Sequence, residues 1–372
     1  RFAVDGTVLS VSTITGLLTW QTGTRTVLQE GASALVLRDN ADPWGMQVRS
    51  FREIEGRFAL LDPNEAAAFC GLTAPTLAPV RVIEDGAVRT VVEALFGYRS
   101  SRLVLRYLLP KHGGPLGLEV RVFWNEKDRF LKLAFPTPMT GGYRGQVSYG
   151  TEDFTADGSE NVGQQWVATH DAEQAFAVIN QGVYGHDCQA GELRLSLLRS
   201  PAYSAHPILD RPLVPQDRNI PRIDQGERVF TLWLTAGPAA ERFASIDREA
   251  LSLNRHPMAL SFFPSGTGTA PPPLAQVDDH AVLITAIKRA EGAARIWIAR
   301  LYNPTAKGRR VTLRLPVLGL TARCNCTPWG IHTLRIDGHT KQVVEVDLLE
   351  RTKAQRKRLG ATPAVRVKTR LK

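Results

Sequence analysis

The stretch LEVRVFWNEKDRFLKLAF, residues 118–135, decides the fold class. Apolar residues fill every second position before the polar run 125–128 and return after it. They are Leu118, Val120, Val122 and Trp124, followed by Phe130, Leu131, Leu133 and Phe135. A period of two indicates strands with one buried face. We therefore predict a long antiparallel hairpin that turns at Asn125–Asp128.

Similar runs recur along the chain and predict ten or more strands. They lie at 87–96, 102–109, 175–180, 192–198, 228–234, 281–287, 296–301, 311–315 and 343–349. Only residues 239–253 resemble a helix. The pattern predicts an all-β protein, built as sandwiches or as a large twisted pair of antiparallel sheets.

Proline and glycine divide the predicted strands into domains. The run 263–274 holds four prolines and two glycines and cannot lie in a central strand, so it predicts a linker. Pro75 and Pro79 bracket a weaker boundary. We predict an N-terminal β-segment (1–75), a central β-domain (76–262), a Pro-rich linker (263–274), a small C-terminal β-domain (275–350) and a basic, disordered tail (351–372).

The positive charge is concentrated at the C-terminus. The net charge is +10, but residues 351–372 hold nine Lys or Arg and no acid, and the other 350 residues carry 37 basic against 36 acidic groups. A neutral body does not favour a nucleic-acid partner, although the tail could contact phosphates. No apolar run reaches the length of a membrane helix, and the first 30 residues, which open at Arg1, lack a signal-peptide pattern.

The cysteines and acids form no recognisable catalytic or metal motif. Cys324 and Cys326 are a C-x-C pair near His332 and His339, but structural zinc motifs usually have a wider cysteine spacing, so buried or edge-strand thiols are favoured. Four irregularly spaced cysteines indicate a reducing compartment. Spacing cannot reveal a catalytic pair of carboxyl groups in a β-protein, because strands distant in the sequence would supply the two groups. We predict no catalytic residue and no metal ligand in this chain.

Three segments are candidates for binding. DNADPWG (39–45) places Trp44 among carboxylates, which suits a sugar ring, although a tryptophan anchoring a sandwich edge is equally ordinary. GVYGHD (182–187) gathers polar aromatic residues but favours a tight turn. Arg199 in LLRSP leaves a strand before a long loop, where a guanidinium could clamp a ligand or form a structural salt bridge.

At these segments the sequence resembles the C-terminal β-region of glycoside hydrolase family 38. The matching stretches are LEVRVFWNEKDRFLKLAFPT (118–137), VINQGVYGHDCQAGELRLSLLRSP (178–201), DQGERVFTLWL (224–234) and LITAIKRAEGAARIWIARLYN (283–303). Their order and spacing resemble that family across residues 1–350. The basic tail departs from the apolar final strand expected of the family.

The resemblance implies a large antiparallel supersandwich, similar to that of galactose mutarotase, with smaller flanking β-sandwich domains. In the family, a zinc-assisted retaining mechanism uses aspartates and histidines of an N-terminal α/β barrel, followed by a three-helix bundle. Neither part is present in this sequence, so the zinc is expected in the missing catalytic domain. Trp44 and Arg199 are the positions that best match the family's substrate-contacting aromatic residue and arginine.

We therefore expect the non-catalytic C-terminal portion of a retaining α-mannosidase, which completes a mannoside pocket and is inactive alone. Its partners would be an α-mannoside or glycan and its own catalytic domain, with no membrane partner. Homo-oligomerisation stays open, and a cytoplasmic location agrees with the neutral body and sparse cysteines. The alternative is a freestanding carbohydrate-binding β-sandwich module.

Overall fold

The computed structural model describes residues 1–4, 6–39, 48–73, 75–202, 221–256, 258, 260, 267–269 and 271–358. The chain divides into two compact units, Arg1–His256 and Pro257–Lys372. Antiparallel strands dominate both units, as the sequence predicts. None of the helices within these ranges is long and apolar enough to cross a membrane.

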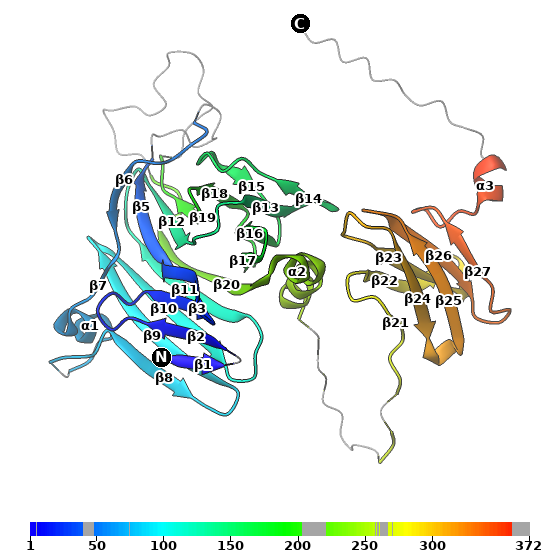
Figure 1. Ribbon diagram of the computed structural model, residues 1–372, viewed down its shortest axis with the longest axis horizontal. Helices are drawn as coiled ribbons and strands as arrows, with labels where there is room; N and C mark the ends of the chain where they lie inside the picture. The colour runs from blue at the N-terminus through cyan, green and yellow to red at the C-terminus, as the bar shows by residue number, and fades with distance from the viewer. Residues whose placement is uncertain are drawn as a thin grey trace, which may run out of the picture. The chain divides into compact units, whose positions relative to one another are not determined.

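Two large sheets form the first unit (Figure 1). In the described residues, the ten-stranded sheet has the order β14 (Gly150–Asp153), β13 (Gly142–Val147), β16 (Trp166–His170), β17 (Gln174–Asn180), β20 (Gly226–Pro238), β11 (Leu116–Trp124), β10 (Ser101–Pro110), β9 (Arg89–Tyr98) and β7 (Ala59–Leu60), and β8 (Val80–Asp85) also pairs with β9. The six-stranded sheet has the order β15 (Asn161–Val162), β18 (Gly185–Gln189), β19 (Glu192–Arg199), β12 (Arg129–Pro136), β5 (Ser33–Arg38) and β6 (Ile54–Arg57). A four-stranded N-terminal sheet runs β1 (Phe2–Val4), β2 (Thr7–Val11), β3 (Leu18–Thr22) and β4 (Arg25–Gly31).

The hairpin predicted at 118–135 is wrong. Both strands exist, but β11 pairs with β10 and β20, whereas β12 pairs with β5 and β19 in the other sheet. The polar run 125–128 therefore crosses from one sheet to the other. It is attached at both ends, because the Asn125 amide donates to Ser101 Oγ (2.9 Å) and the Asp128 amide donates to the Ser200 carbonyl (2.8 Å). Both edges of β12 are occupied by β5 and β19, so β11 cannot pair with it.

The main hydrophobic core lies between these sheets. Alternate residues of β11 enter it from one side and Leu131, Leu133 and Phe135 of β12 enter it from the other. Trp124 is fully buried there, and its Nε1 donates to Ser200 Oγ (3.0 Å), so the polar end of the indole keeps a partner. The predicted segment 1–75 contributes strands to both large sheets, where β5 pairs with β12 and β7 pairs with β9 of the predicted domain 76–262.

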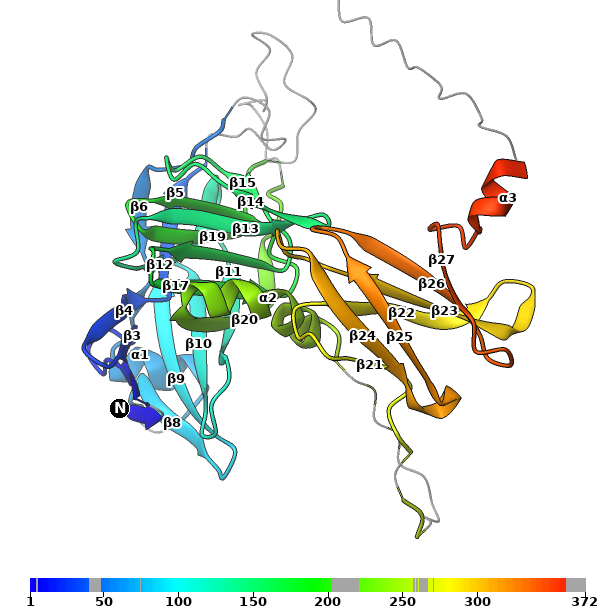
Figure 2. The same ribbon diagram turned by 45° about the vertical axis from the view of Figure 1, so that its right-hand side comes forward.

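Two helices lie on the outer face of the ten-stranded sheet (Figure 2). The predicted helix at 239–253 is confirmed as α2 (Ala239–Asn254), whose Ile246 and Ala250 pack on Trp166 and Ile179. The second helix, α1 (Pro63–Phe69), was not predicted from the sequence. A capping box starts it, since Asp62 accepts from the Glu65 amide and the Glu65 side chain accepts from the Asp62 amide.

The second unit is a smaller sandwich. In its described part, β21 (Gln276–Val277), β24 (Arg309–Leu315) and β25 (Leu320–Cys326) form one sheet, and β22 (Leu283–Ala290), β23 (Ala293–Tyr302), β26 (Ile331–Asp337) and β27 (Val343–Val346) form the other. A short 3-10 helix, Pro316–Leu318, joins β24 to β25. Leu301 and Leu334 of one sheet meet Leu313 and Cys324 of the other in a single core.

The predicted linker (263–274) and the predicted disordered tail (351–372) both belong to the second unit. Residues 267–269 and 271–274 of the predicted linker are described and carry neither helix nor strand. The tail predicted to be disordered contains the helix α3 (Lys353–Arg358). Thr352 and Gln355 begin it by mutual capping, because the Thr352 amide donates to Gln355 Oε1 (2.8 Å) and the Gln355 amide donates to Thr352 Oγ1 (3.3 Å).

Candidate functional site

Arg199 ends β19, where its guanidinium clamps a buried carboxylate. Its Nε and Nη2 donate to Asp39 Oδ2 (2.9 Å) and Oδ1 (2.8 Å), and the Asp39 side chain is fully buried. The guanidinium carbon also lies 4.7 Å from the ring centre of Phe51 and 5.5 Å from that of Phe130. A bidentate pair between two aromatic rings fixes the plane of the guanidinium.

A second bidentate pair lies directly beside the first. Arg222 Nε and Nη2 donate to the two carboxylate oxygens of Asp128 at 2.9 and 3.0 Å. The Asp39 amide donates to the Asp128 carbonyl (3.1 Å), so the two pairs are adjacent. We call Asp39, Asp128, Arg199 and Arg222 the strand-end cluster. The sequence analysis missed Arg222, because nothing near it in the sequence shows that it meets the turn at 125–128.

Trp44 belongs to residues 40–47, which lie outside the described residues. Both described flanks of this segment are anchored on the six-stranded sheet. Asp39 is held by Arg199 on one side, and on the other side Ser50 Oγ donates to the Gly158 carbonyl (2.8 Å) and Arg52 donates to Asp187 (2.7 Å). The predicted pairing of Trp44 with Arg199 around a sugar stays a prediction.

A buried charge cluster continues from Arg199 along the outer face of the same sheet. Lys132 is fully buried on β12, and its Nζ donates to Glu160 and Asp187. Asp187 also pairs with Arg52, and Ser196 Oγ donates to Glu160 (2.9 Å). Burial lowers the pKa of Lys132 to about 8, against the pull of the Asp187 charge. Lys132 and Asp187 each have two partners of opposite charge in this cluster, which offsets the cost of burying them.

The segment 182–187, a candidate in the sequence, supplies part of this cluster. A turn does precede it, where the Val183 amide donates to Asn180 Oδ1 (2.9 Å). His186 and Asp187, however, are buried strand residues of β18. His186 Nδ1 shares a hydrogen bond with the Tyr143 hydroxyl, and burial lowers the pKa of His186 to about 4. The tight-turn prediction therefore holds for the start of the segment and fails at its end.

The buried carboxylates have partners that explain them structurally. Among the described residues they are Asp39, Glu93, Glu126, Asp187 and Asp247. Ion pairs hold Asp39, Glu93 and Asp187, and Ser101 Oγ donates to Glu126 (2.8 Å). Burial raises the pKa of Asp247, which accepts from Trp166 Nε1 (3.1 Å) and Gln146 Nε2 (2.8 Å). These contacts give each acid a structural role.

The C-x-C pair is buried in the second unit. The sulfurs of Cys324 and Cys326 lie 3.8 Å apart, and all four cysteines are free. His332 uses both ring nitrogens, since Nε2 accepts from the Thr327 amide (3.0 Å) and Nδ1 pairs with Glu345 (2.8 Å). Within the described ranges, no group of three or more His, Cys, Asp and Glu side chains is arranged to hold a metal ion. The prediction of buried thiols at 324 and 326 is confirmed.

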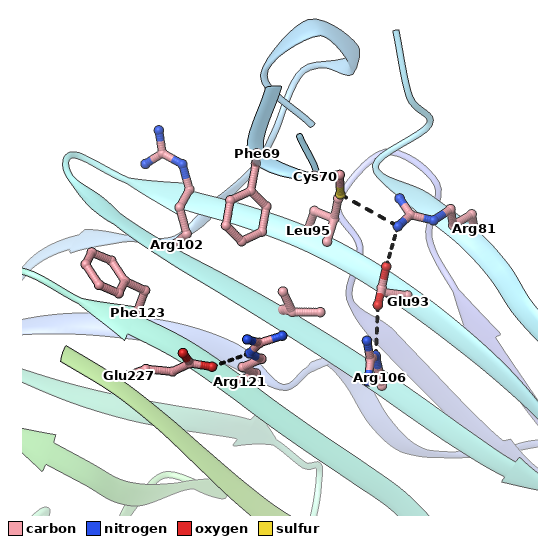
Figure 3. Close-up of a pocket in the computed structure, with 11 residues that line it drawn as sticks. Phe69, Cys70, Arg81, Glu93, Leu95, Arg102, Arg106, Arg121, Phe123 and Glu227 are labelled. Carbon is pink, nitrogen blue, oxygen red and sulfur yellow. Dashed lines mark hydrogen bonds and ion pairs between the residues drawn. The ribbon is translucent and has the colours of Figure 1, made fainter. Parts of the chain in front are cut away.

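An open pocket of about 440 Å³ lies on the outer face of the ten-stranded sheet, next to α1 (Figure 3). Phe69 and Phe123 line it, together with the buried apolar residues Leu95 and Val104. Four arginines and two glutamates also line it, namely Arg81, Arg102, Arg106, Arg121, Glu93 and Glu227. The sequence analysis did not identify this site, because its residues come from five strands and a helix end.

The geometry first defines a class of protein. In the first unit, two large antiparallel sheets enclose one core, and the second unit is a smaller sandwich with a core of its own. This is the all-β supersandwich architecture that the sequence predicts. The fold is shared with an α-mannosidase from Enterococcus faecalis V583 (15% identity, TM-score 0.68) and with a protein in the glycosyl hydrolase family 38 from Enterococcus faecalis (15% identity, TM-score 0.70). These matches cover 88% and 89% of this chain, and 41% and 43% of those chains.

The family follows from the sequence comparisons. Residues 60–212 match the model of the glycosyl hydrolases family 38 C-terminal domain. The chain is also similar to alpha-mannosidase G of Dictyostelium discoideum, with 25% identity over 246 residues, covering 60% of this chain and 20% of that protein. The predicted resemblance is confirmed, because residues 60–212 are similar to the family 38 C-terminal domain. It spans about a fifth of the Dictyostelium relative and about two fifths of the bacterial structures.

Proposed function

We propose that this chain is the non-catalytic C-terminal β-region of a retaining α-mannosidase, which supports and completes the mannoside pocket of a catalytic α/β barrel. The family domain supports this proposal, and so do two similar proteins that are α-mannosidases. The chain matches only 20% and 41% of those proteins, which agrees with a catalytic region that lies in the remaining part. The catalytic carboxylates and the zinc would belong to the other region.

The observation that carries the proposal is the clamp between Arg199 and Asp39. Asp39 directly precedes the segment that holds Trp44, and Arg199 holds Asp39 through two hydrogen bonds. A sugar site needs side chains whose orientation is fixed before the substrate arrives, because ordering them on binding costs affinity. The clamp holds Asp39, the residue before the Trp44 segment, and the contacts of Ser50 and Arg52 hold the chain after it.

The zinc is not assigned to residues of this chain. His332 and the two thiols of the C-x-C pair come closest to a ligand set, but both ring nitrogens of His332 have other partners. The proposal therefore routes no step of hydrolysis through these residues. We also propose a cytoplasmic protein, since three of its four free cysteines are buried and one is exposed, with no disulfide among them.

The first test is an assay of the purified chain with 4-nitrophenyl α-mannoside, with and without added zinc. We expect no turnover in either case. Zinc-dependent turnover by the isolated chain would refute the proposal. A calorimetric titration with α-linked mannobiose distinguishes the alternative, because a freestanding carbohydrate-binding module would bind the disaccharide without a catalytic domain.

The second test concerns the pocket of the whole enzyme that the proposal requires. Trp44→Ala and Arg199→Ala should each raise KM for the mannoside at least tenfold, because each removes a contact to the bound sugar or its support. The control is Arg89→Gln, which breaks an exposed ion pair with Glu84 on the β8–β9 hairpin. Unchanged KM in both variants would show that this region does not complete the pocket.

A further inference from the structure

The pocket beside α1 lies away from the strand-end cluster. Arg121 and Phe123 alternate along β11 with the core residues Val120 and Val122, so they point to the outer face of the ten-stranded sheet. Arg199 belongs to the six-stranded sheet on the other side of that core. The two places therefore do not belong to one site, and a ligand in this pocket would be separate from the proposed mannoside.

Charge in the pocket is arranged in two groups. Arg81 Nη2 and Arg106 Nε both donate to Glu93, at 2.6 and 2.8 Å, and the Glu93 side chain is only 6% exposed (Figure 3). Arg121 Nε donates to Glu227 (2.5 Å), and both of these side chains are about half exposed. The buried glutamate holds two guanidinium groups in place, while the exposed pair borders the open side.

Hydrogen-bond donors outnumber acceptors in the pocket. Arg121 uses only Nε, and Arg106 uses Nε and Nη1, in contacts among the described residues. The terminal nitrogens Nη1 and Nη2 of Arg121 and Nη2 of Arg106 keep donor capacity. A guanidinium with two donors available matches a carboxylate in a bidentate contact. Glu119 accepts from Arg106 Nη1 (3.1 Å), so four guanidinium groups face three carboxylates, and this balance also favours a ligand with negative charge.

Exposed aromatic rings complete the pocket. Phe123 is 50% exposed and Phe69 is 40% exposed, and both side chains line this same pocket, so their rings are accessible to a ligand. Their rings and the side chains of Leu95 and Val104 offer an apolar surface to a ligand ring. The volume of about 440 Å³ lies within the usual range for small-molecule sites, about 300 to 1,000 Å³.

We propose that this pocket binds an acidic sugar residue, with a carboxylate on Arg121 and Arg106 and the apolar face of the sugar ring on Phe123. Glu227 lines the pocket, where it can accept a hydrogen bond from a ring hydroxyl. A neutral sugar would leave the guanidinium donors unmatched, and an anion without an apolar face would leave both phenylalanines exposed. The combination therefore selects a uronic acid over mannose and over inorganic phosphate.

The test uses digalacturonate as the acidic probe and α-linked mannobiose as its neutral match. We expect calorimetry of the whole chain to show binding of digalacturonate that weakens as salt is added, because the guanidinium groups are partly exposed. Arg121→Gln should weaken binding at least tenfold, and Phe123→Ala should also weaken it. Arg89→Gln removes the same charge from an exposed ion pair outside the pocket and should leave the affinity unchanged.

A second readout locates the ligand. Cys70 lines the pocket and is exposed, whereas Cys188, Cys324 and Cys326 are buried. Digalacturonate should slow alkylation of Cys70 by iodoacetamide, and mannobiose should not. The proposal is overturned if mannobiose protects Cys70 as well as digalacturonate does, if Arg121→Gln and Arg89→Gln behave alike, or if digalacturonate does not protect Cys70. None of these outcomes depends on whether the chain supports a mannosidase.

Discussion

Replacing His186 with glutamine should remove part of the acid sensitivity of the first unit. His186 is 2% exposed, its Nδ1 shares a hydrogen bond with the Tyr143 hydroxyl, and its Nε2 has no hydrogen-bond partner among the described residues. A protonated ring there would be a buried cation close to Lys132. Glutamine keeps a hydrogen bond to Tyr143 but cannot gain the charge.

The size of the effect follows from two pKa values. Burial lowers the pKa of His186 to about 4, with the Lys132 charge acting in the same direction, and the value for an unperturbed imidazole is about 6.5. The unfolded chain therefore binds a proton at higher pH than the folded chain. The stability from the neutral ring is fully present above pH 6.5 and is lost as the pH falls to 4. At about 1.4 kcal/mol for each pH unit between the two values, the loss at pH 4 is about 3 kcal/mol.

The assay is guanidinium unfolding at pH 7.5 and pH 4, followed by hydrogen exchange of peptides from β16 and β18. These peptides report on the first unit alone, which matters because the chain has two compact units. The unmodified chain should lose about 3 kcal/mol more stability on acidification than His186→Gln. The control is His112→Gln, at an exposed position between β10 and β11, which should follow the unmodified chain. Equal acid losses in the unmodified chain and His186→Gln would refute the reasoning.

Three further predictions concern packing and reactivity. Arg199→Ala leaves the buried Asp39 carboxylate unpaired and should cost about 3 to 5 kcal/mol in urea unfolding, whereas Arg89→Gln should cost about 1 kcal/mol or less. Phe176→Ala empties a fully buried position and should also cost about 3 to 5 kcal/mol, as thermal unfolding will show. Cys70 should react with a maleimide before the other three cysteines in the native chain, and peptide mapping by mass spectrometry checks this order.

The strands were predictable because their signal is local. Alternation of apolar residues located β9, β10, β17, β19 and β20 to within a few residues, and α2 was found from its sequence pattern. The pairing of strands was not predictable in the same way. Periodicity shows which side of a strand is buried, but it does not show which strand lies beside it. At 118–135 a polar run that looks like a hairpin turn leads into the other sheet.

The site was predictable only in part, for a related reason. Arg199 was a candidate because it lies at the end of a predicted strand, before a long loop. Its partner Asp39 could not be predicted, because it is 160 residues away in the sequence. Lys132 looked like one polar residue in an apolar strand, and only the fold brings Asp187 and Glu160 to it. A local signal that was overlooked is the capping box of Asp62 and Glu65 at α1, which forms one side of the pocket.

The crossing of the chain between sheets bears on how the domain can be shortened. Residues 60–212, the span of the family match, omit β20, which lies between β17 and β11 and pairs with both. They also omit β5, the neighbour of β12. A polypeptide trimmed to that span would expose long unpaired edges of β17, β11 and β12, and such edges recruit other chains. We expect it to aggregate, so the evolutionary unit recognised by the family match is smaller than the unit that can fold alone.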